Sequence, residues 1–337
     1  MTPPAPTTTE TRRAEKSARI DVVIVNYRTG ALVCDCLDSL VAESVRLPGM
    51  RVTITDNASG DGSIDEIAQH IEAKGYADWA ATMPLDDNGG FAYGNNAAIR
   101  VALERDTPPE AVLLLNPDTV IRPGAVEAIW AFMEAHPEVG IAGSRLEHPD
   151  ESVQTSCFRF PGFAGEVEEA ARFGPVTRLL SRWVVAPTPP ADAQPCDWVS
   201  GASMMVRRAV FEDVGLLDDG FFMYYEELDF IRRAADAGWP CWYVPESRVV
   251  HLVGQASGVT DLKKPQKRRP AYWFEARARY FRRHHGVVGK LWIDLGWVAG
   301  RVCFKLMNAV RRKPTNDPPH LIRDYIRHNL IPGGASR

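Results

Sequence analysis

Short apolar runs alternate with helical patterns of apolar residues over the first 250 residues of the chain. Continuous Val, Ile and Leu predict buried strands at 22–25, 52–55 and 111–115. Apolar residues spaced three and four apart predict helices at 31–43, 64–73, 97–104 and 125–135. Strands separated by helices of this length form right-handed βαβ units, so the pattern predicts an α/β fold with a mainly parallel sheet flanked by helices.

A polar cluster follows each predicted strand. The clusters are Asn26-Tyr27, Asp56-Asn57-Ala58-Ser59-Gly60-Asp61 and Asn116-Pro117-Asp118. Because ligands bind beyond the carboxyl ends of parallel strands, we expect these side chains at a ligand-binding edge of the sheet.

A glycine-rich segment, 88–96, leads into one of the predicted helices. Glycine lets a backbone approach a phosphate closely, and a helix N-terminus favours an anion. The segment is not a G-x-G-x-x-G fingerprint, because Phe91 stands where the second glycine would be. The chain also lacks the G-x-x-x-x-G-K-[ST] motif, so the sequence disfavours both a dinucleotide dehydrogenase and a P-loop NTPase.

The composition divides the chain into three regions. Residues 1–18 mix Pro, Thr and charged residues without an apolar run, which predicts a flexible tail and no secretory signal. Residues 19–262 carry the α/β pattern, and 263–337 form a basic helical extension. The six cysteines are scattered, which argues against a disulfide framework and favours a reducing, cytoplasmic compartment.

The net charge of −4 hides a strong asymmetry. Residues 263–313 hold fifteen Lys or Arg and two acidic residues. Such a segment is a solvated charged face, or it binds nucleic acid or an anionic membrane surface. The chain has no run of 18 apolar residues, so a transmembrane span is not expected.

Residues 290–312 have the pattern of an amphipathic helix with a narrow polar stripe. The stripe consists of Lys290, Asp294, Arg301, Lys305, Asn308 and Arg312. The other residues are mainly apolar and include Trp292 and Trp297. A broad apolar face with tryptophans and basic residues is typical of a helix lying in a bilayer interface. The alternative is that the apolar face packs on the preceding α/β domain.

An ordered series of motifs resembles the family 2 glycosyltransferases, and within them the rhamnosyltransferase-like branch. The motifs are Val25-Asn26-Tyr27, Asp56-Asn57-x-Ser59-x-Asp61, Asn88-x-Gly90-Phe91-Ala92-x-Gly94-Asn95-Asn96, Asn116-Pro117-Asp118, Gly201-Ala202, Glu226-Glu227-x-Asp229 and His251. The resemblance covers about residues 19–285. It implies a GT-A fold, a nucleotide-sugar donor, a divalent cation and inversion at the anomeric carbon.

The resemblance implies a Mg²⁺ or Mn²⁺ site at Asp118 and His251. A divalent cation offsets the negative charge of a sugar diphosphate leaving group, and an imidazole ligand favours Mn²⁺. Val120 replaces the second acid of the D-x-D pattern that is common in the family. The alternatives are a turn or helix cap for Asp118 and a buried core histidine for His251.

Asp56 resembles the residue that reads the pyrimidine base. A carboxylate accepts the N3–H of uracil or thymine but not the unprotonated N3 of cytosine, which predicts a UDP- or dTDP-sugar donor. The remaining residues assigned to the donor pocket are Asn26, Asp61, Gly90, Asn95, Asn116 and Asp118. An Asx turn at Asp56 is compatible with this role.

An inverting transfer needs one general base and no carboxylate nucleophile. The family places an Asp at the position of Glu227, so we expect Glu227 to be the base and Asp229 to be its substitute. Both lie at the start of a helix predicted over 226–237. The alternative is that these acids only complement the helix dipole.

Acceptor binding is assigned to a segment that resembles the family's acceptor site. Its candidates are Trp198, Gly201 and Ala202, together with Glu226. Trp198 is equally compatible with a place in the core. Residues 161–195 are predicted to form a loop over the site, and 272–285 a helix that binds a diphosphate or packs its aromatic residues on the core.

Together these features predict an inverting glycosyltransferase of cell-surface polysaccharide synthesis. We expect it to move one sugar, rhamnose in the favoured case, onto a polyprenyl-diphosphate-linked glycan at the inner face of the cell membrane. A nucleotide-sugar-binding protein without turnover is the first alternative. The second is a nucleic-acid-binding protein, which would leave every motif before residue 263 unexplained, so no nucleic acid is expected.

Overall fold

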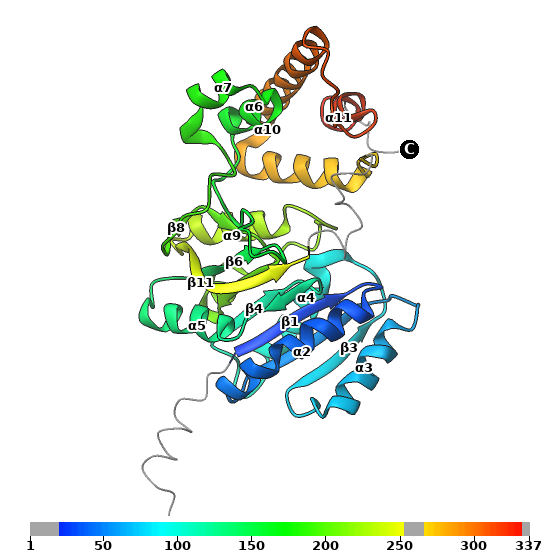
Figure 1. The fold of residues 1–337 in the computed structure, drawn as a ribbon, viewed down its shortest axis with the longest axis vertical. Coiled ribbons are helices and arrows are strands. Elements are labelled where there is room, and N and C mark those ends of the chain that lie inside the picture. Colours follow the sequence, from blue (N-terminus) through cyan, green and yellow to red (C-terminus); the bar gives the residue numbers. More distant parts are fainter. Residues whose placement is uncertain (1–19, 253–265, 332–337) are drawn as a thin grey trace, which may run out of the picture.

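The computed structural model describes residues 20–252 and 266–331. A nine-stranded sheet lies at its centre with helices on both faces, and a helical module lies beyond one end of the sheet (Figure 1). The tail predicted for residues 1–18 lies outside the described residues. The α/β expectation is therefore confirmed.

The first half of the chain forms four parallel strands. In chain order the elements are β1 (Ile20–Asn26), α2 (Gly30–Arg46), β2 (Arg51–Asn57), α3 (Ser63–Lys74), β3 (Ala80–Leu85), α4 (Gly90–Leu103) and β4 (Ala111–Leu115). The strands lie in the order β3-β2-β1-β4, as right-handed crossovers through these helices allow. The pattern predicted β1, β2 and β4 but missed β3, and α4 begins seven residues before the predicted 97.

The second half completes the sheet. Its elements are β5 (Thr119–Ile121), α5 (Ala125–Ala135), β6 (Ile141–Glu147), β8 (Gln194–Cys196), β10 (Ser203–Arg207), α8 (Arg208–Val214), α9 (Glu226–Asp236) and β11 (Cys241–His251). β6 and β11 run in the direction of β1, whereas β10, β5 and β8 run against it. The short pair β7 (Cys157–Phe158) and β9 (Trp198–Val199) lies apart.

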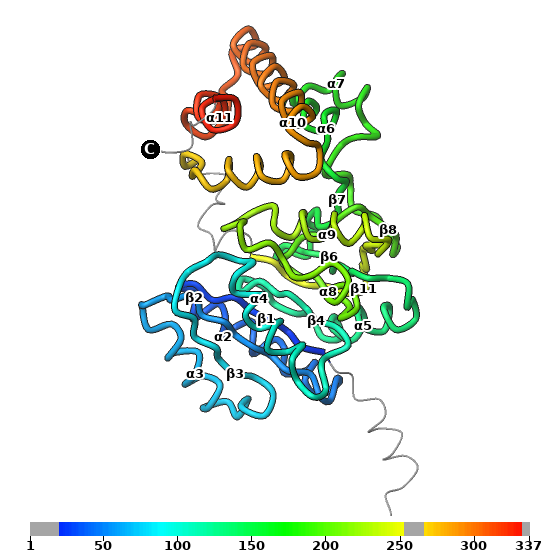
Figure 2. The backbone as a smooth tube through the Cα atoms, turned by 180° about the vertical axis from the view of Figure 1, so that it is seen from behind, coloured from blue at the N-terminus to red at the C-terminus, as the bar shows by residue number. Residues whose placement is uncertain are grey.

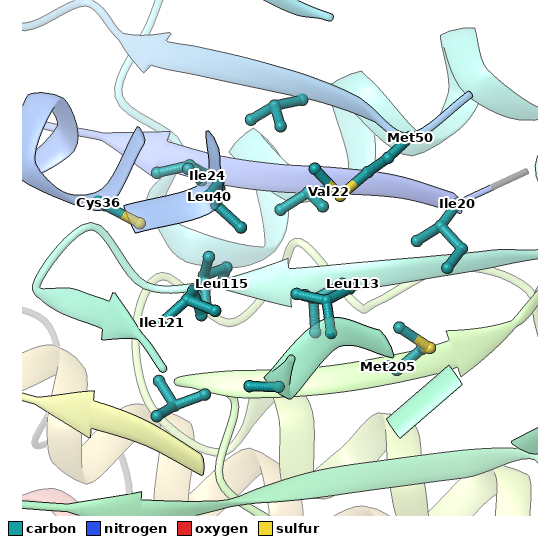
Figure 3. Close-up of a cluster of buried hydrophobic side chains, with 14 of the residues drawn as sticks. Ile20, Val22, Ile24, Cys36, Leu40, Met50, Leu113, Leu115, Ile121 and Met205 are labelled. Atoms are coloured by element: carbon teal, nitrogen blue, oxygen red, sulfur yellow. The ribbon is translucent and has the colours of Figure 1, made fainter. Parts of the chain in front are cut away.

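Alternation along β1 divides the core between the two faces of the sheet. Val22 and Ile24 belong to a cluster with residues of α2, α3 and α5, whereas Val23 belongs to a cluster with residues of α4, α8 and α9. Figure 3 shows the first cluster, in which Leu115 of β4 lies near Ile24. A strand buried on both faces explains the unbroken apolar runs of the sequence.

The helical module combines two distant parts of the chain. It contains α6 (Phe163–Ala171), α7 (Gly174–Leu179) and the 3₁₀ turn Ser181–Trp183 from the middle of the sequence, and α10 (Ala271–Val310) and α11 (Leu321–Asn329) from the end. Figure 2 shows α6 beside α10. The prediction of a loop over 161–195 is therefore wrong for 163–183, and the division at residue 262 separates elements that pack together.

α10 consists of two helical halves joined at Gly286. The backbone there has φ 68° and ψ 179°, outside the helical region. Glycine accepts this conformation without the steric cost that a side chain adds. The first half lies across the carboxyl-end side of the sheet, and the second half rises away from it (Figures 1 and 2).

Candidate functional site

A cavity of about 580 Å³ lies at the carboxyl ends of β1 and β4, where ligands are expected in an open α/β sheet. Loops after the strands, the start of α4, the start of α9 and the first half of α10 form its wall. Eight of the predicted site residues line it: Gly90, Asn116, Asp118, Gly201, Ala202, Glu226, Glu227 and His251. Residues that are far apart in the sequence thus meet at one site.

Gly90 marks a place where two segments of the cavity wall approach closely. Its φ is 88°, and a Cβ added there would lie 1.7 Å from the carbonyl oxygen of Phe222. The same carbonyl accepts a hydrogen bond from the amide of Phe91 at 3.1 Å. Only glycine fits this contact, which ties the start of α4 to the loop before α9.

Asp118 and His251 lie together in the cavity wall. Asp118 follows β4, His251 ends β11, and His251 Nε2 lies 3.5 Å from Asp118 Oδ1. The pairing of β11 with β5 places them together, since His251 is opposite Thr119. Over residues 20–252 and 266–331, no group of three or more His, Cys, Asp and Glu side chains is placed to hold a metal ion.

These two side chains nevertheless fit a divalent cation that is shared with a bound diphosphate. One carboxylate oxygen and one imidazole nitrogen, adjacent at a cavity wall, supply a mixed hard and borderline donor set. Sites that act on nucleotide phosphates commonly use one or two protein ligands and complete the coordination with phosphate oxygens and water. The donor set thus matches Mg²⁺ or Mn²⁺.

Glu226 and Glu227 bring two carboxyl groups to the same cavity at the start of α9. Within the part of the chain that the structure describes, the Oε2 atoms of both are buried and have no hydrogen-bond partner. Burial raises the pKa of Glu227. Burial, and then the charge of Glu227, raise the pKa of Glu226 well above its usual value. A carboxylate with a raised pKa is a stronger base near neutral pH.

The loop before α9 has a strained backbone and carries aromatic residues that the sequence did not indicate as part of the site. Tyr224 and Tyr225 have φ of 71° and 69°, a conformation that non-glycine residues rarely adopt. Phe222, Tyr224 and Tyr272 line the cavity. The Tyr272 ring lies 5.4 Å from that of Phe222 and 6.2 Å from that of Tyr224. The aromatic run 221–225, directly before the acidic pair, was the available signal.

Asn26 and Asp56 form a buried network behind the cavity. Asn26 Nδ2 donates to Asp56 Oδ1 at 2.6 Å, and Ser59 donates to both oxygens of Asp56 through its hydroxyl group and its amide. The carboxylate accepts from an amide three residues on, and not two residues on as in an Asx turn. Neither Asn26 nor Asp56 lines the cavity. At the ends of the same two strands, Tyr27 and Asn57 line it instead.

Three other predicted residues also lie outside the cavity wall. Asp61 accepts a hydrogen bond from the Ser63 amide at 3.0 Å near the start of α3. Asn95 is buried in α4 and donates to the Phe91 carbonyl at 2.9 Å. Trp198 stacks on Phe158 and donates to the Arg159 carbonyl at 3.0 Å, as its alternative core role predicted.

Asp229 differs from Glu227 in its surroundings. It is fully buried and does not line the cavity. Arg233, Arg283 and His284 all contact its carboxylate at 2.8–3.0 Å. Burial acts to raise its pKa, but the hydrogen bonds from His284 and the two arginines hold it below its usual value. This geometry disfavours Asp229 as the base and assigns it to joining α9 to α10.

Comparisons with known proteins agree with this arrangement. The family model described as Glycosyltransferase like family 2 matches residues 18–284. N-acetylglucosaminyl-diphospho-decaprenol L-rhamnosyltransferase of Mycobacterium tuberculosis is 28% identical over 247 residues, which cover 71% of this chain and 78% of that protein. Rhamnosyltransferase WbbL of Escherichia coli is 22% identical over 233 residues, which cover 68% of this chain and 82% of that protein.

A solved structure shares the fold. The mannosyltransferase PcManGT from Pyrobaculum calidifontis, in complex with GDP-Man and Mn²⁺, matches with a TM-score of 0.54 and 15% sequence identity. The match covers 87% of this chain and 75% of that one. It confirms the GT-A architecture that the motif series implied.

Proposed function

The chain belongs to glycosyltransferase like family 2, and we propose that it is an inverting enzyme that transfers a single rhamnose from dTDP-rhamnose, or a sugar from a UDP donor, to a polyprenyl-diphosphate-linked glycan. Glycosyltransferase activity follows from the family. The observation that carries the mechanism is the meeting of Asp118, His251 and Glu227 at one cavity.

Glu227 is the general base in this proposal. It takes the proton from an acceptor hydroxyl group, whose oxygen forms the new bond to the anomeric carbon as the bond to the nucleoside diphosphate breaks. Its raised pKa and its place in the cavity suit this step. A general base of this kind contributes about 10²- to 10⁴-fold to the rate.

Asp118 and His251 would hold the divalent cation, Mg²⁺ or Mn²⁺. The bound cation supplies positive charge that stabilises the leaving diphosphate. The Mn²⁺ in the complex of PcManGT, which has the same fold, supports this assignment. The residues that bind the donor are also part of this proposal. In it, Asp56 positions Asn57 and Tyr27 at the cavity wall.

The acceptor assignment rests on the relatives and on the shape of the cavity wall. The mycobacterial relative is named for an N-acetylglucosaminyl-diphospho-decaprenol acceptor. Phe222, Tyr224 and Tyr272 offer aromatic faces on which an acceptor sugar can stack. Gly201 and Ala202 leave room beside Glu227, since a Cβ added at Gly201 would lie 3.5 Å from Glu227 Cβ.

The structure weakens the nucleic-acid alternative, because part of the basic charge of the C-terminal extension is buried or paired with acidic residues of the protein itself. Arg277, Lys290 and Arg301 are buried. Others form ion pairs: Arg268 with Asp324, Arg279 with Asp218, and Arg283 with Asp229 and Asp218. We assign the extension to the membrane side of the proposal, at the inner face of the cell membrane, because a polyprenyl-linked acceptor is itself anchored in a bilayer.

A mass-spectrometric transfer assay tests the proposal. The purified chain is given dTDP-rhamnose or a UDP-sugar, Mn²⁺ or Mg²⁺, and a short, water-soluble polyprenyl-diphosphate-GlcNAc analogue. We expect a product heavier by one sugar, no product with chelator, and weaker metal-dependent binding of donor by Asp118→Asn. Nucleotide binding without transfer under any of these conditions would favour the alternative of a binding protein.

A further inference from the structure

The second half of α10 is amphipathic, but its charged side faces the protein and its apolar side faces solvent. This is the reverse of an ordinary surface helix. Three residues of its predicted polar stripe, Lys290, Asp294 and Arg301, are buried, with exposed fractions of 6%, 0% and 4%. The stripe faces α6 and α11 instead of solvent. The alternative was that the apolar side packs on the catalytic domain. It is wrong for the large apolar residues of the second half of α10 that are exposed.

A buried ion network fixes this orientation. Arg277 donates to Asp294 and to Glu166, each at 2.6 Å. Lys290 and Tyr325 donate to Asp294 at 2.5 and 2.8 Å. Turning the helix to bury its apolar side would take these charges away from their partners and leave them unpaired, which is strongly unfavourable. The apolar side is therefore held outward.

The outward side forms a continuous strip, which we name the α10 apolar face. Its side chains have exposed fractions between 39% and 85% and recur at helical spacing: Val287, Val288, Leu291, Trp292, Leu295, Val302, Leu306 and Val310. Scattered apolar residues are normal on a surface, but large exposed apolar residues gathered on one side of a helix indicate an interaction site. No helix of the described residues is long and apolar enough to span a bilayer.

Charge and residue type identify the occupant. The exposed run Arg311-Arg312-Lys313 follows directly after the α10 apolar face, and Arg282 is exposed just before it. Basic residues beside an apolar strip that contains an exposed tryptophan suit the headgroup region of an anionic bilayer. A partner protein with a neutral apolar surface would make no use of these charges.

We propose that the α10 apolar face docks the enzyme on an anionic bilayer surface. This inference rests on the proposed function, because a polyprenyl-linked acceptor is itself anchored in a bilayer. α10 connects the two sites: its first half lines the cavity through Tyr272, and its second half carries the apolar face. Docking would therefore hold the cavity beside the membrane in which the acceptor diphosphate lies.

Vesicle co-sedimentation of the full chain tests the inference. Vesicles of phosphatidylglycerol and phosphatidylcholine are compared with vesicles of phosphatidylcholine alone. We expect binding to the anionic vesicles that weakens with salt, and a loss of at least about tenfold in the double variant Trp292→Glu/Leu306→Glu. Val45→Glu, at a 75% exposed valine of α2, is the matched control and should bind like the wild type.

Other outcomes overturn the inference. The inference is overturned if the double variant and the wild type bind equally. It is also overturned if the wild type does not bind to anionic vesicles. A wild-type dimer in analytical ultracentrifugation that the double variant dissociates would assign the face to a second copy. Transfer to the water-soluble acceptor is measured alongside: transfer without vesicle binding removes only the docking inference, and vesicle binding without transfer removes only the proposed reaction.

Discussion

The carboxylates of the cavity and those of the helical module differ in their partners. In the module, Glu166 and Asp294 share Arg277, and Asp294 also accepts from Lys290 and Tyr325. In the cavity, Glu226 and Glu227 each keep a buried oxygen without a partner among the described residues. The first group therefore keeps its charge at little cost, whereas the second is held in a state that favours protonation.

This difference separates residues that hold the fold from residues that are available for chemistry. The oxygens of paired carboxylates already accept hydrogen bonds from other side chains of the protein, so they have no capacity left for a substrate proton. Carboxylates that keep one buried oxygen without a partner at a cavity destabilise the folded state but are ready to accept a proton from a ligand. Asp229 belongs to the first group although it lies only two residues from Glu227.

The largest effect is expected from Glu227→Gln. The amide cannot take the acceptor proton, so we expect kcat to fall by about 10²- to 10⁴-fold. Donor affinity should stay within about twofold, because the substitution leaves the charge at Asp118 and the shape of the cavity unchanged. Steady-state transfer kinetics with calorimetric nucleotide binding measure both quantities. Wild-type turnover in this variant would remove Glu227 from the mechanism.

Arg277→Met should give the next largest effect, on stability instead of catalysis. Removing the arginine leaves Glu166 without its 2.6 Å partner and Asp294 with one partner fewer. Breaking a buried pair in this way costs about 3–5 kcal/mol of the free energy of unfolding. Urea unfolding followed by circular dichroism measures the loss. A loss below about 1 kcal/mol would show that the network does not hold the module together.

Glu226→Gln should stabilise the protein at neutral pH. Since the folded-state pKa of Glu226 is raised above 4.5, the folded state binds more protons and loses stability as pH rises above that value. The neutral amide removes the loss, so we expect a higher free energy of unfolding than that of the wild type at pH 7.5. The gain should shrink toward pH 4.5. Urea unfolding at the two pH values checks this sign.

The smallest effect is expected from an exposed pair. Arg46 contacts Glu127 at 3.1 Å, and both side chains are about half exposed. Solvent and salt screen such a pair, so Arg46→Ala should change the free energy of unfolding by less than about 1 kcal/mol. The same unfolding experiment measures it. A loss as large as that of Arg277→Met would mean that burial is not what distinguishes the two ion pairs.

The sequence predicted most elements of the first half of the catalytic domain because their signals are local. β1, β4 and α5 follow directly from the apolar pattern, and Asp118 from its place after a strand. His251 was assigned through the resemblance of the motif series. β3 was missed because its sequence, Ala-Ala-Thr-Met-Pro-Leu, has neither a Val/Ile run nor a clear alternation. Its parallel pairing with β2 decides its conformation, which is tertiary information.

The module shows what the sequence could not supply. The spacing of Lys290, Asp294 and Arg301 predicted one helical stripe but not the direction in which it points. That direction depends on Glu166, which lies more than a hundred residues away in α6. In the same way, only the resemblance ranked Glu227 before Asp229 in the sequence. The contacts of Arg233, Arg283 and His284 with Asp229 distinguish the two in the structure.

The pH dependence of kcat/KM, with and without Glu227, tests the central claim most directly. Wild-type activity should fall on the acid side with a midpoint above the ordinary carboxyl pKa of 4.5, because Glu227 is then protonated and cannot act as a base. The residual activity of Glu227→Gln should lack this acid limb. An acid limb with the same midpoint in both proteins would contradict the account and assign the base to another group.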